Sequence, residues 1–368
     1  MKTECTEHER WMRRALNLAR RGVGLTRPNP AVGAVVVARG RVVGEGYHRC
    51  AGGPHAEVYA LRQAGRRAAG ATLYITLEPC CTWGRTPPCT AAILTSGVAQ
   101  LVVAVRDPNP SHHGRGLRLL RRHGLGVREG ICAAEAAELI RPFRTWVLKG
   151  RPQVTLKLAL TVDGRIADAR GRARWITGAK ARQVVHALRR QADAILIGRG
   201  TAAADNPGLL PVPAGGRRPF RVLVDSRGEL PAGLRVLTDA AAPRTIVAVT
   251  ARCPPARRRA LAAGGAQVWV MPARQGGVSL KALLARLGRM GLLHVVCEGG
   301  GELAAGLIEA GLVDDFRLFL APRVLGGPAK PAVGGRGWPL ASCPELDFLS
   351  VERLGPDILI CARPRAGP

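Results

Sequence analysis

The strongest local signal in the sequence is the stretch Leu77-Glu78-Pro79-Cys80-Cys81-Thr82-Trp83-Gly84-Arg85-Thr86-Pro87-Pro88-Cys89, which is preceded by His55-Ala56-Glu57. One histidine and two cysteine thiolates suit tetrahedral zinc and leave a fourth position open. A lone His-x-Glu, or two cysteines with eight residues between them, is a weak signal. Together and in this order, each following a predicted strand, they predict a zinc site at His55, Cys80 and Cys89.

The same pattern predicts a chemistry. Zinc lowers the pKa of water in its open position, and a glutamate two residues after the histidine moves protons in nucleobase deaminases. Glu57 has this spacing and is the predicted proton shuttle. The Cys-x8-Cys spacing is wider than the Cys-x2-Cys of nucleic-acid deaminases, and Cys81 is a competing ligand. A further protein ligand would make the site structural.

The flanking sequence predicts an α/β first domain over residues 1–148, because apolar strand-sized runs alternate with helical patterns. Helices are expected at 9–21, 55–64, 89–96 and 117–123, and strands at 31–38, 41–45, 72–77 and 101–105. Lys149-Gly150-Arg151-Pro152 follows as a predicted hinge.

A second α/β domain is predicted over residues 152–364, where the alternation restarts. Strands are expected at 154–160, 194–197, 221–224, 245–249, 268–271, 295–297, 317–320 and 358–360, and helices at 180–190, 255–263, 280–290 and 302–310. Cys297-Glu298-Gly299-Gly300-Gly301 joins a strand to a helix, where glycines let backbone amides approach a phosphate. Alone, such a turn is more often a tight connection.

Composition limits the class of protein. With 368 residues and 47% hydrophobic residues, the chain has enough apolar material for two cores. No apolar run approaches the roughly 18 residues of a membrane helix. The charged start at Glu7-His8-Glu9-Arg10 lacks the apolar core of a signal peptide, which predicts a cytoplasmic protein. The ten scattered cysteines do not form a disulfide framework.

The net charge of +29 raises the alternative of nucleic-acid binding. Only six of the 55 basic residues are lysine, and the arginines are spread along the chain rather than gathered in a tract. Aromatic residues make up 4%, which leaves few platforms for stacking single-stranded bases. We therefore favour a small phosphorylated partner, and keep a basic nucleic-acid-binding protein with a deaminase-like domain as the alternative.

The zinc stretch resembles that of the bifunctional deaminase–reductase family of riboflavin biosynthesis, as do Pro28-Asn29-Pro30-Ala31-Val32-Gly33, His55-Ala56-Glu57 and Asp107-Pro108-Asn109-Pro110. The resemblance covers nearly the whole chain. It implies a cytidine-deaminase-like three-layer domain, with His55, Cys80 and Cys89 on zinc and Glu57 as shuttle. Asn29, His48 and Arg85 would contact the pyrimidine or its phosphate.

In the second domain the resemblance rests on Lys157, Thr161-Val162-Asp163-Gly164, Trp175-Ile176-Thr177, Gly198, Thr201, Asp205-Asn206-Pro207 and the glycine run. It implies a dihydrofolate-reductase-like fold that uses NADPH. Cofactor contacts would be Ala159, Trp175, Thr201, Asp205, Ser226 and Gly299, Gly300 and Gly301. Substrate contacts would be Arg189, Leu209 and Glu298. Lys157 and Asp205 are the candidates for polarising the sugar carbon or moving its proton.

The chain departs from the family pattern at several positions. Cys81-Thr82 replaces a Ser-His whose imidazole helps to hold substrate, and Ala173 replaces a serine. After Leu209, a threonine and an arginine are replaced in Leu210-Pro211-Val212; the nearby pair Arg217-Arg218 is a candidate substitute.

Our interpretation is a multifunctional, homo-oligomeric riboflavin-pathway enzyme, dimeric or tetrameric. It would deaminate 2,5-diamino-6-(5-phosphoribosylamino)pyrimidin-4-one and then reduce the ribosyl chain. The alternative enzyme is a diverged paralogue that deaminates another aminopyrimidine with an altered or lost reductase.

Overall fold

The computed structural model describes residues 6–84, 86–213 and 218–365. The chain divides into two compact units, Met1–Gly150 and Arg151–Pro368. In both units helices alternate with strands of one mixed sheet, so the predicted α/β class is confirmed. Within the described residues, no helix is long and apolar enough to cross a membrane.

The first unit is built on a five-stranded sheet with the order β2-β1-β3-β4-β5. Strand β1 pairs antiparallel with β2 and β3, whereas β3, β4 and β5 are parallel. The strands are β1 (Gly33–Ala38), β2 (Arg41–Tyr47), β3 (Thr72–Leu77), β4 (Gln100–Val105) and β5 (Gly126–Glu129). The helices are α1 (Glu7–Arg20), α2 (Ala56–Ala64), α3 (Cys89–Thr95), α4 (Arg115–Arg122), α5 (Ala133–Leu139) and α6 (Arg141–Lys149), with a 3-10 turn η1 (Gly65–Ala68).

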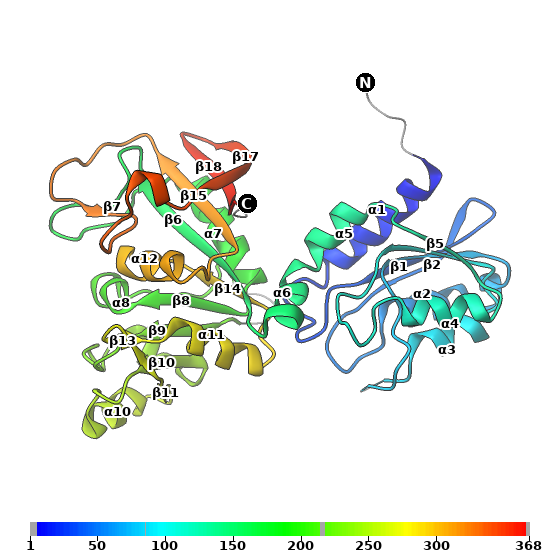
Figure 1. Ribbon diagram of the computed structural model, residues 1–368, viewed down its shortest axis with the longest axis horizontal. Coiled ribbons are helices and arrows are strands. Elements are labelled where there is room, and N and C mark those ends of the chain that lie inside the picture. Colours follow the sequence, from blue (N-terminus) through cyan, green and yellow to red (C-terminus); the bar gives the residue numbers. More distant parts are fainter. Residues whose placement is uncertain (1–5, 85, 214–217, 366–368) are drawn as a thin grey trace. The chain divides into compact units, whose positions relative to one another are not determined.

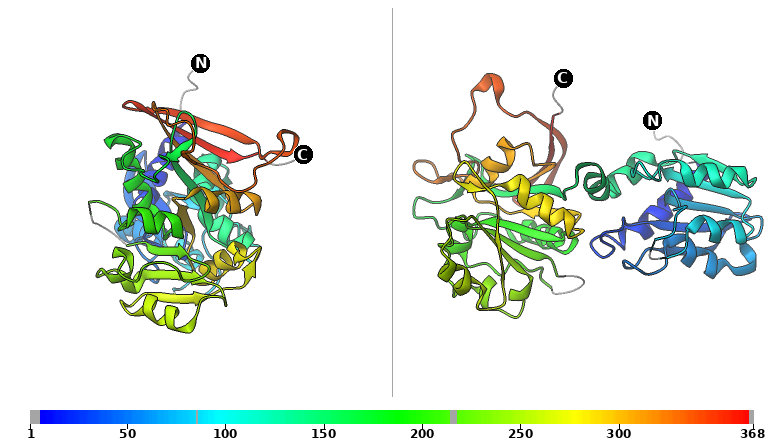
Figure 2. Two further views of the ribbon diagram at one scale, coloured as in Figure 1. Left: turned by 90° about the vertical axis from the view of Figure 1, so that its left-hand side faces the viewer. Right: turned by 60° about the horizontal axis from the view of Figure 1, so that its bottom comes forward.

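The sheet is buried on both faces, which makes three layers (Figures 1 and 2). Along β1, Val35 and Val37 pack with α1 and α5, whereas Ala34 and Val36 pack with α2, α3 and α4. Because alternate side chains of a strand point to opposite faces, a run of consecutive apolar residues is what a doubly covered strand requires.

The second unit is built on a nine-stranded sheet with the order β11-β10-β9-β8-β14-β6-β15-β18-β17. The first seven of these strands are parallel, β18 pairs antiparallel with β15, and the edge strand β17 pairs antiparallel with β18. The sheet strands are β6 (Gln153–Thr161), β8 (Ala194–Gly198), β9 (Phe220–Val224), β10 (Thr245–Val249), β11 (Gln267–Val270), β14 (His294–Cys297), β15 (Asp315–Ala321), β17 (Leu346–Leu354) and β18 (Asp357–Pro364). Two small ribbons pair β7 (Arg165–Ala167) with β16 (Lys330–Pro331) and β12 (Ala273–Arg274) with β13 (Gly277–Val278).

Helices cover both faces of this sheet as well. Helices α11 and α12 pack on one core cluster, and α8, α9 and α10 pack on the cluster of the opposite face, while α7 packs near β15 and β18. These helices are α7 (Ala179–Gln191), α8 (Arg199–Asp205), α9 (Arg235–Thr238), α10 (Pro255–Ala262), α11 (Leu280–Arg289) and α12 (Gly301–Glu309). Short 3-10 turns are η2 (Ala242–Arg244) and η3 (Leu340–Ser342). The loops at the carboxyl ends of the parallel strands are therefore where a ligand site is expected.

Candidate active sites

Three elements of the first unit bring the predicted metal ligands together. His55 caps the N-terminus of α2, Cys89 is the first residue of α3, and Cys80 follows β3. Their ligand atoms all lie within 4.8 Å of one another, and no other such group of His, Cys, Asp or Glu occurs in the described part of the chain. His55 Nδ1 lies 3.0 Å from Cys89 Sγ and 3.6 Å from Cys80 Sγ. Cys81 is not part of the group.

The donor set fits zinc. Two sulfurs and one imidazole nitrogen are the ligands of a three-residue catalytic zinc site. The Cys89 thiol lowers the pKa of Cys80 by hydrogen bonding, and the backbone N–H of Cys89, which donates to Cys80 Sγ at 3.3 Å, acts in the same direction. A thiol that ionises this readily is prepared to ligate a metal as thiolate.

Glu57 lies beside the ligands in the first turn of α2 and is 3% exposed. Burial raises its pKa, and among the described residues its Oε2 has no hydrogen-bond partner. A buried carboxylate oxygen without a hydrogen-bond partner lowers the stability of the fold. A bound water or substrate that donates to this oxygen would remove the penalty.

Asn29 and His48 lie next to this group. His48 Nδ1 donates to the carbonyl of Pro54 at 3.0 Å, so its Nε2 accepts from the amide nitrogen of Asn29 at 3.1 Å. Burial lowers the pKa of His48, which keeps the ring neutral, and the ring stands edge-on to His55 with centroids 5.1 Å apart. The third predicted substrate contact, Arg85, lies outside the described residues.

Glu78 belongs to the stretch that contains the cysteines, but the sequence assigned it no role. Its buried carboxylate accepts from the backbone N–H groups of Asp107 at 3.1 Å, Gly114 at 2.8 Å and Gly116 at 3.0 Å. It thereby fastens the loop after β4 to the end of β3, two residues before Cys80. The available sequence signal was a carboxylate in an otherwise apolar run.

In the second unit, all the predicted reductase residues line one cavity of about 1170 Å³. The predicted cofactor contacts among them are Ala159, Trp175, Thr201, Asp205, Ser226 and Gly299–Gly301. The predicted substrate contacts are Arg189, Leu209 and Glu298, and Lys157 lines the same space.

An ion-pair cluster forms part of its wall. Arg189 binds Glu298 through two hydrogen bonds of 2.6 and 2.7 Å, and Lys157 Nζ lies 4.0 Å from the same carboxylate. Burial alone would raise the pKa of Glu298, but Arg189 and Lys157 outweigh it and lower the pKa. Burial lowers the pKa of Lys157 and raises that of Asp205, whose charge is partly offset by Arg174 and Lys157. Ionisable groups with shifted pKa values that line one cavity, as Glu298, Lys157 and Asp205 do, are typical of an active site.

The glycine run approaches its neighbours closely. A Cβ at Gly301 would lie 2.7 Å from the carbonyl oxygen of Pro331, and one at Gly300 would lie 3.1 Å from Thr201 Oγ1. These glycines open α12, so the N-terminus of that helix, whose first N–H groups have no partner within the helix, lies at the cavity that the glycines line. The backbone therefore fits a phosphate-bearing cofactor.

The positions of the second unit that depart from the family pattern lie in different places. Ala173 lines the cavity, and the carbonyl of Leu210 accepts from Arg189 at 3.4 Å. Arg217 lies outside the described residues, and the carbonyl of Arg218 accepts from Arg244 at 2.7 Å. Asp163, from the Thr-Val-Asp-Gly motif, does not line the cavity; it accepts from the N–H groups of Leu325 and Gly326 and thereby holds a loop.

Two family models match the chain. The model of the RibD C-terminal domain matches residues 152–360, and that of the cytidine and deoxycytidylate deaminase zinc-binding region matches residues 5–105. The riboflavin biosynthesis protein RibD of Aquifex aeolicus is 42% identical over 353 residues, covering 95% of this chain and 96% of the relative. RibD of Escherichia coli is 39% identical over 371 residues, covering 96% and 98%.

Solved structures agree with this. Acinetobacter baumannii RibD matches with a TM-score of 0.89 and 36% identity over 99% of this chain and 100% of that chain. The diaminohydroxyphosphoribosylaminopyrimidine deaminase/5-amino-6-(5-phosphoribosylamino)uracil reductase of Thermotoga maritima matches with a TM-score of 0.87 and 36% identity. The match covers 98% of this chain and 99% of that chain. The predicted succession of a cytidine-deaminase-like unit and a reductase unit is confirmed.

Proposed function

This chain belongs to the RibD family of riboflavin biosynthesis, and from that premise we propose roles for its residues in deamination and in reduction. The first unit is a zinc-dependent deaminase and the second an NADPH-dependent reductase. The substrate is 2,5-diamino-6-(5-phosphoribosylamino)pyrimidin-4-one, whose deaminated product then has its ribosyl chain reduced to ribityl. The observation that carries the assignment is the buried, unpartnered Oε2 of Glu57 beside His55, Cys80 and Cys89.

In the first unit, His55, Cys80 and Cys89 would hold the zinc. When bound, the metal lowers the pKa of water in its open position and so supplies the nucleophile. Glu57 Oε2 accepts one proton of the attacking water and passes it to the ring nitrogen. It then carries the second proton, from the hydroxyl added to the ring carbon, to the amino group, which departs as ammonia. Burial suits Glu57 to this role, because its raised pKa lets it carry the proton between these steps.

Asn29 and His48 orient the pyrimidine. The Asn29 amide nitrogen is bound to His48 Nε2, so its carbonyl oxygen is turned by that bond and can accept from an amino group of the ring. His48 is itself fixed by Pro54, and this chain of bonds gives the site one orientation.

In the second unit, NADPH when bound would supply a hydride to the sugar carbon C1, which is electrophilic when the sugar ring is open. Lys157 would donate the balancing proton to the heteroatom that is doubly bonded to C1. Asp205, whose charge acts on Lys157, is the second candidate for polarising that carbon or moving this proton. Arg189 and Glu298 bind the substrate as a pair; the lowered pKa of Glu298 keeps its carboxylate ionised. Gly299–Gly301 and the first turn of α12 hold a cofactor phosphate.

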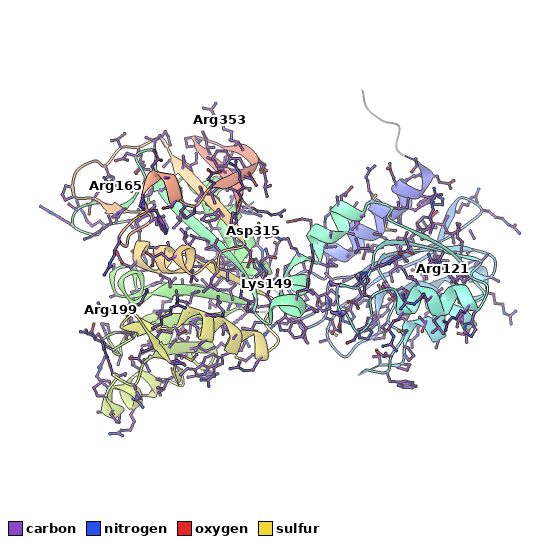
Figure 3. The ribbon with its side chains drawn as sticks, in the orientation of Figure 1. Arg121, Lys149, Arg165, Arg199, Asp315 and Arg353 are labelled. Atoms are coloured by element: carbon purple, nitrogen blue, oxygen red, sulfur yellow. The ribbon has the colours of Figure 1, made fainter. Side chains whose placement is uncertain are left out.

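The paralogue alternative rests on the departures at Cys81-Thr82 and Ala173, which alter both sites without removing a zinc ligand. Nucleic-acid binding is supported by less: Figure 3 shows Arg121 on the first unit and Arg165, Arg199 and Arg353 at separate places on the second. Basic side chains that are spread in this way do not outline a track for a phosphate backbone.

The homo-oligomer, dimer or tetramer, is part of the proposal. The edge strand β17 exposes Phe348 and Val351, which are 66% and 62% exposed. An open edge with apolar side chains is a surface that a second copy would cover. Light scattering of the purified protein tests it, and a monomer at micromolar concentration would contradict it.

The decisive experiment gives the purified protein the diaminopyrimidinone phosphate with and without NADPH. Ammonia release without NADPH, followed by NADPH oxidation when it is added, is the expected result. Ammonia release without any oxidation would favour the paralogue. Retention on RNA with no turnover of pyrimidines would favour the nucleic-acid alternative.

A further inference from the structure

The substrate cavity of the second unit lacks the arginine that the family pattern places at position 212, where this chain has Val212. The side chain of Val212 is 63% exposed and carries no charge. A phosphorylated substrate still needs a cationic partner at this end of the cavity. The polar groups nearest to the backbone of Val212 belong to helix α7.

Helix α7 presents Arg182, His186 and Arg189 to the cavity. They are spaced by four and three residues, so they lie on one face of the helix. Arg189 is already bound to the carboxylate of Glu298. Arg182 and His186 are instead bound to backbone groups, Arg182 to the carbonyl of Thr177 and His186 to the N–H of Val212.

His186 is oriented by the backbone at the position of the missing arginine. The N–H of Val212 donates to His186 Nδ1 at 3.2 Å. A nitrogen that accepts this bond carries no proton, so in the neutral ring the proton sits on Nε2. Burial and the neighbouring Arg189 lower the pKa of His186, which favours this neutral form. Nε2–H is then a fixed donor.

Arg182 supplies charge. Its Nη1 donates to the carbonyl of Thr177 at 2.8 Å, and its guanidinium lies 4.7 Å from the ring centroid of Trp175. Among the described residues, no carboxylate lies within salt-bridge distance of it. A guanidinium that is held in place, lines a cavity and has no anionic partner is a ready site for a phosphate.

We infer that Arg182 and His186 form the phosphate-binding corner of the reductase substrate site and take over the role of the arginine absent at position 212. The inference rests on the proposed reductase function. It makes the ligand of this corner the 5-phosphate of the pentose chain.

The test is Arg182→Gln, assayed with the deaminated phosphate intermediate and with the same compound after removal of its phosphate. We expect kcat/KM for the phosphorylated substrate to fall about 10- to 100-fold and that for the dephosphorylated one to change less than about twofold, because only a charge-assisted bond to phosphate is lost. His186→Ala should have the same selectivity with a smaller, few-fold effect. Lys180→Gln is the control: the same helix loses one positive charge, from an exposed side chain that does not line the cavity.

Adding Val212→Arg to Arg182→Gln should restore the preference for phosphate. Absence of restoration, equal losses on both substrates, or a weaker NADPH affinity in place of the phosphate effect would each overturn the inference. If wild-type protein reduces neither substrate, the reductase proposal fails separately. Calorimetric titration with ribose 5-phosphate still tests whether Arg182 and His186 bind phosphate. Binding that Arg182→Gln abolishes supports the inference, and equal binding by the wild-type protein and the variant refutes it.

Discussion

The two candidate sites are specified in different ways. The site of the first unit consists of three ligand atoms within 4.8 Å and one buried carboxylate, and only a few residue types can provide such groups. The cavity of the second unit, at about 1170 Å³, is lined by the glycine run and by the opposite charges of Lys157, Arg189 and Glu298. Many residue types can line such a wall, so we expect all-or-none effects of substitution in the first site and graded effects in the second.

Glu57→Gln tests the all-or-none expectation. The amide cannot carry a proton, so ammonia release should fall about 1,000-fold, while zinc measured by mass spectrometry should stay at about one per chain because Glu57 is not a ligand. NADPH-dependent reduction of the deaminated intermediate is the internal control and should be unchanged. An active Glu57→Gln enzyme would refute the mechanism.

Lys157→Ala should give the largest effect in the second site. Reduction should slow about 100-fold because the proton donor is gone, while the NADPH dissociation constant changes little. Single-turnover oxidation of NADPH measures the first quantity and fluorescence titration the second. A parallel loss of both would mean that Lys157 supports the cavity rather than the chemistry.

Gly300→Val should weaken NADPH binding about 30-fold, since a branched side chain would press on Thr201, whose Oγ1 lies 3.1 Å from the position of a Cβ. Deamination should be unaffected. Gly233→Val is a matched control, because a Cβ at Gly233 meets no atom within 4 Å. Normal NADPH binding by the Gly300 variant would remove the glycine run from the cofactor site.

The pH dependence should also separate the sites. Burial lowers the pKa of Lys157 from 10.5, so its ammonium form is complete at low pH and is lost as pH rises, earlier than for an exposed lysine. Reduction should therefore fall about tenfold per pH unit above that pKa. The rate of reduction measured in Lys157→Ala should lack this alkaline limb; a limb that persists would point to another group.

Thr82→His should give the smallest effect. Restoring an imidazole adds one hydrogen bond, which should lower the Michaelis constant for the diaminopyrimidinone about two- to tenfold without changing kcat. A loss of activity would indicate a pocket adapted to another aminopyrimidine and would favour the paralogue.

The sequence predicted most of the elements that form the sites, because those elements have strong local patterns. The run Ala31–Ala38 predicted a buried strand, and β1 is that strand. Helices α5 and α6 were not predicted: they span only seven and nine residues, and each buries a single residue, Ala136 or Thr145. Strand β17 was missed for a related reason, because its side chains are mostly exposed.

For the sites, the sequence could indicate residue types but not contacts between distant segments. Glu78 acts through backbone amides about thirty residues away, which leave no side-chain pattern to read. In the same way, the bond between His186 and the backbone of Val212 depends on the packing of α7 beside a loop. Neither contact produces a repeating pattern or a fixed residue spacing that could be recognised in the sequence.

Glu78 has a practical consequence for redesign. Its carboxylate is bound by the main-chain N–H groups of Asp107, Gly114 and Gly116, and a Cβ at Gly116 would lie 2.3 Å from the carbonyl oxygen of Pro79. These three bonds use main-chain N–H groups, whereas Asn109 and His113 shape the loop through their side chains: Asn109 Oδ1 accepts from the N–H of Ser111, and His113 Nδ1 donates to the carbonyl of Asp107. Residues 110–112 are therefore the positions to vary in a search for new pyrimidine specificities, because their replacement should leave both ends of the loop bound to the segment between β3 and Cys80.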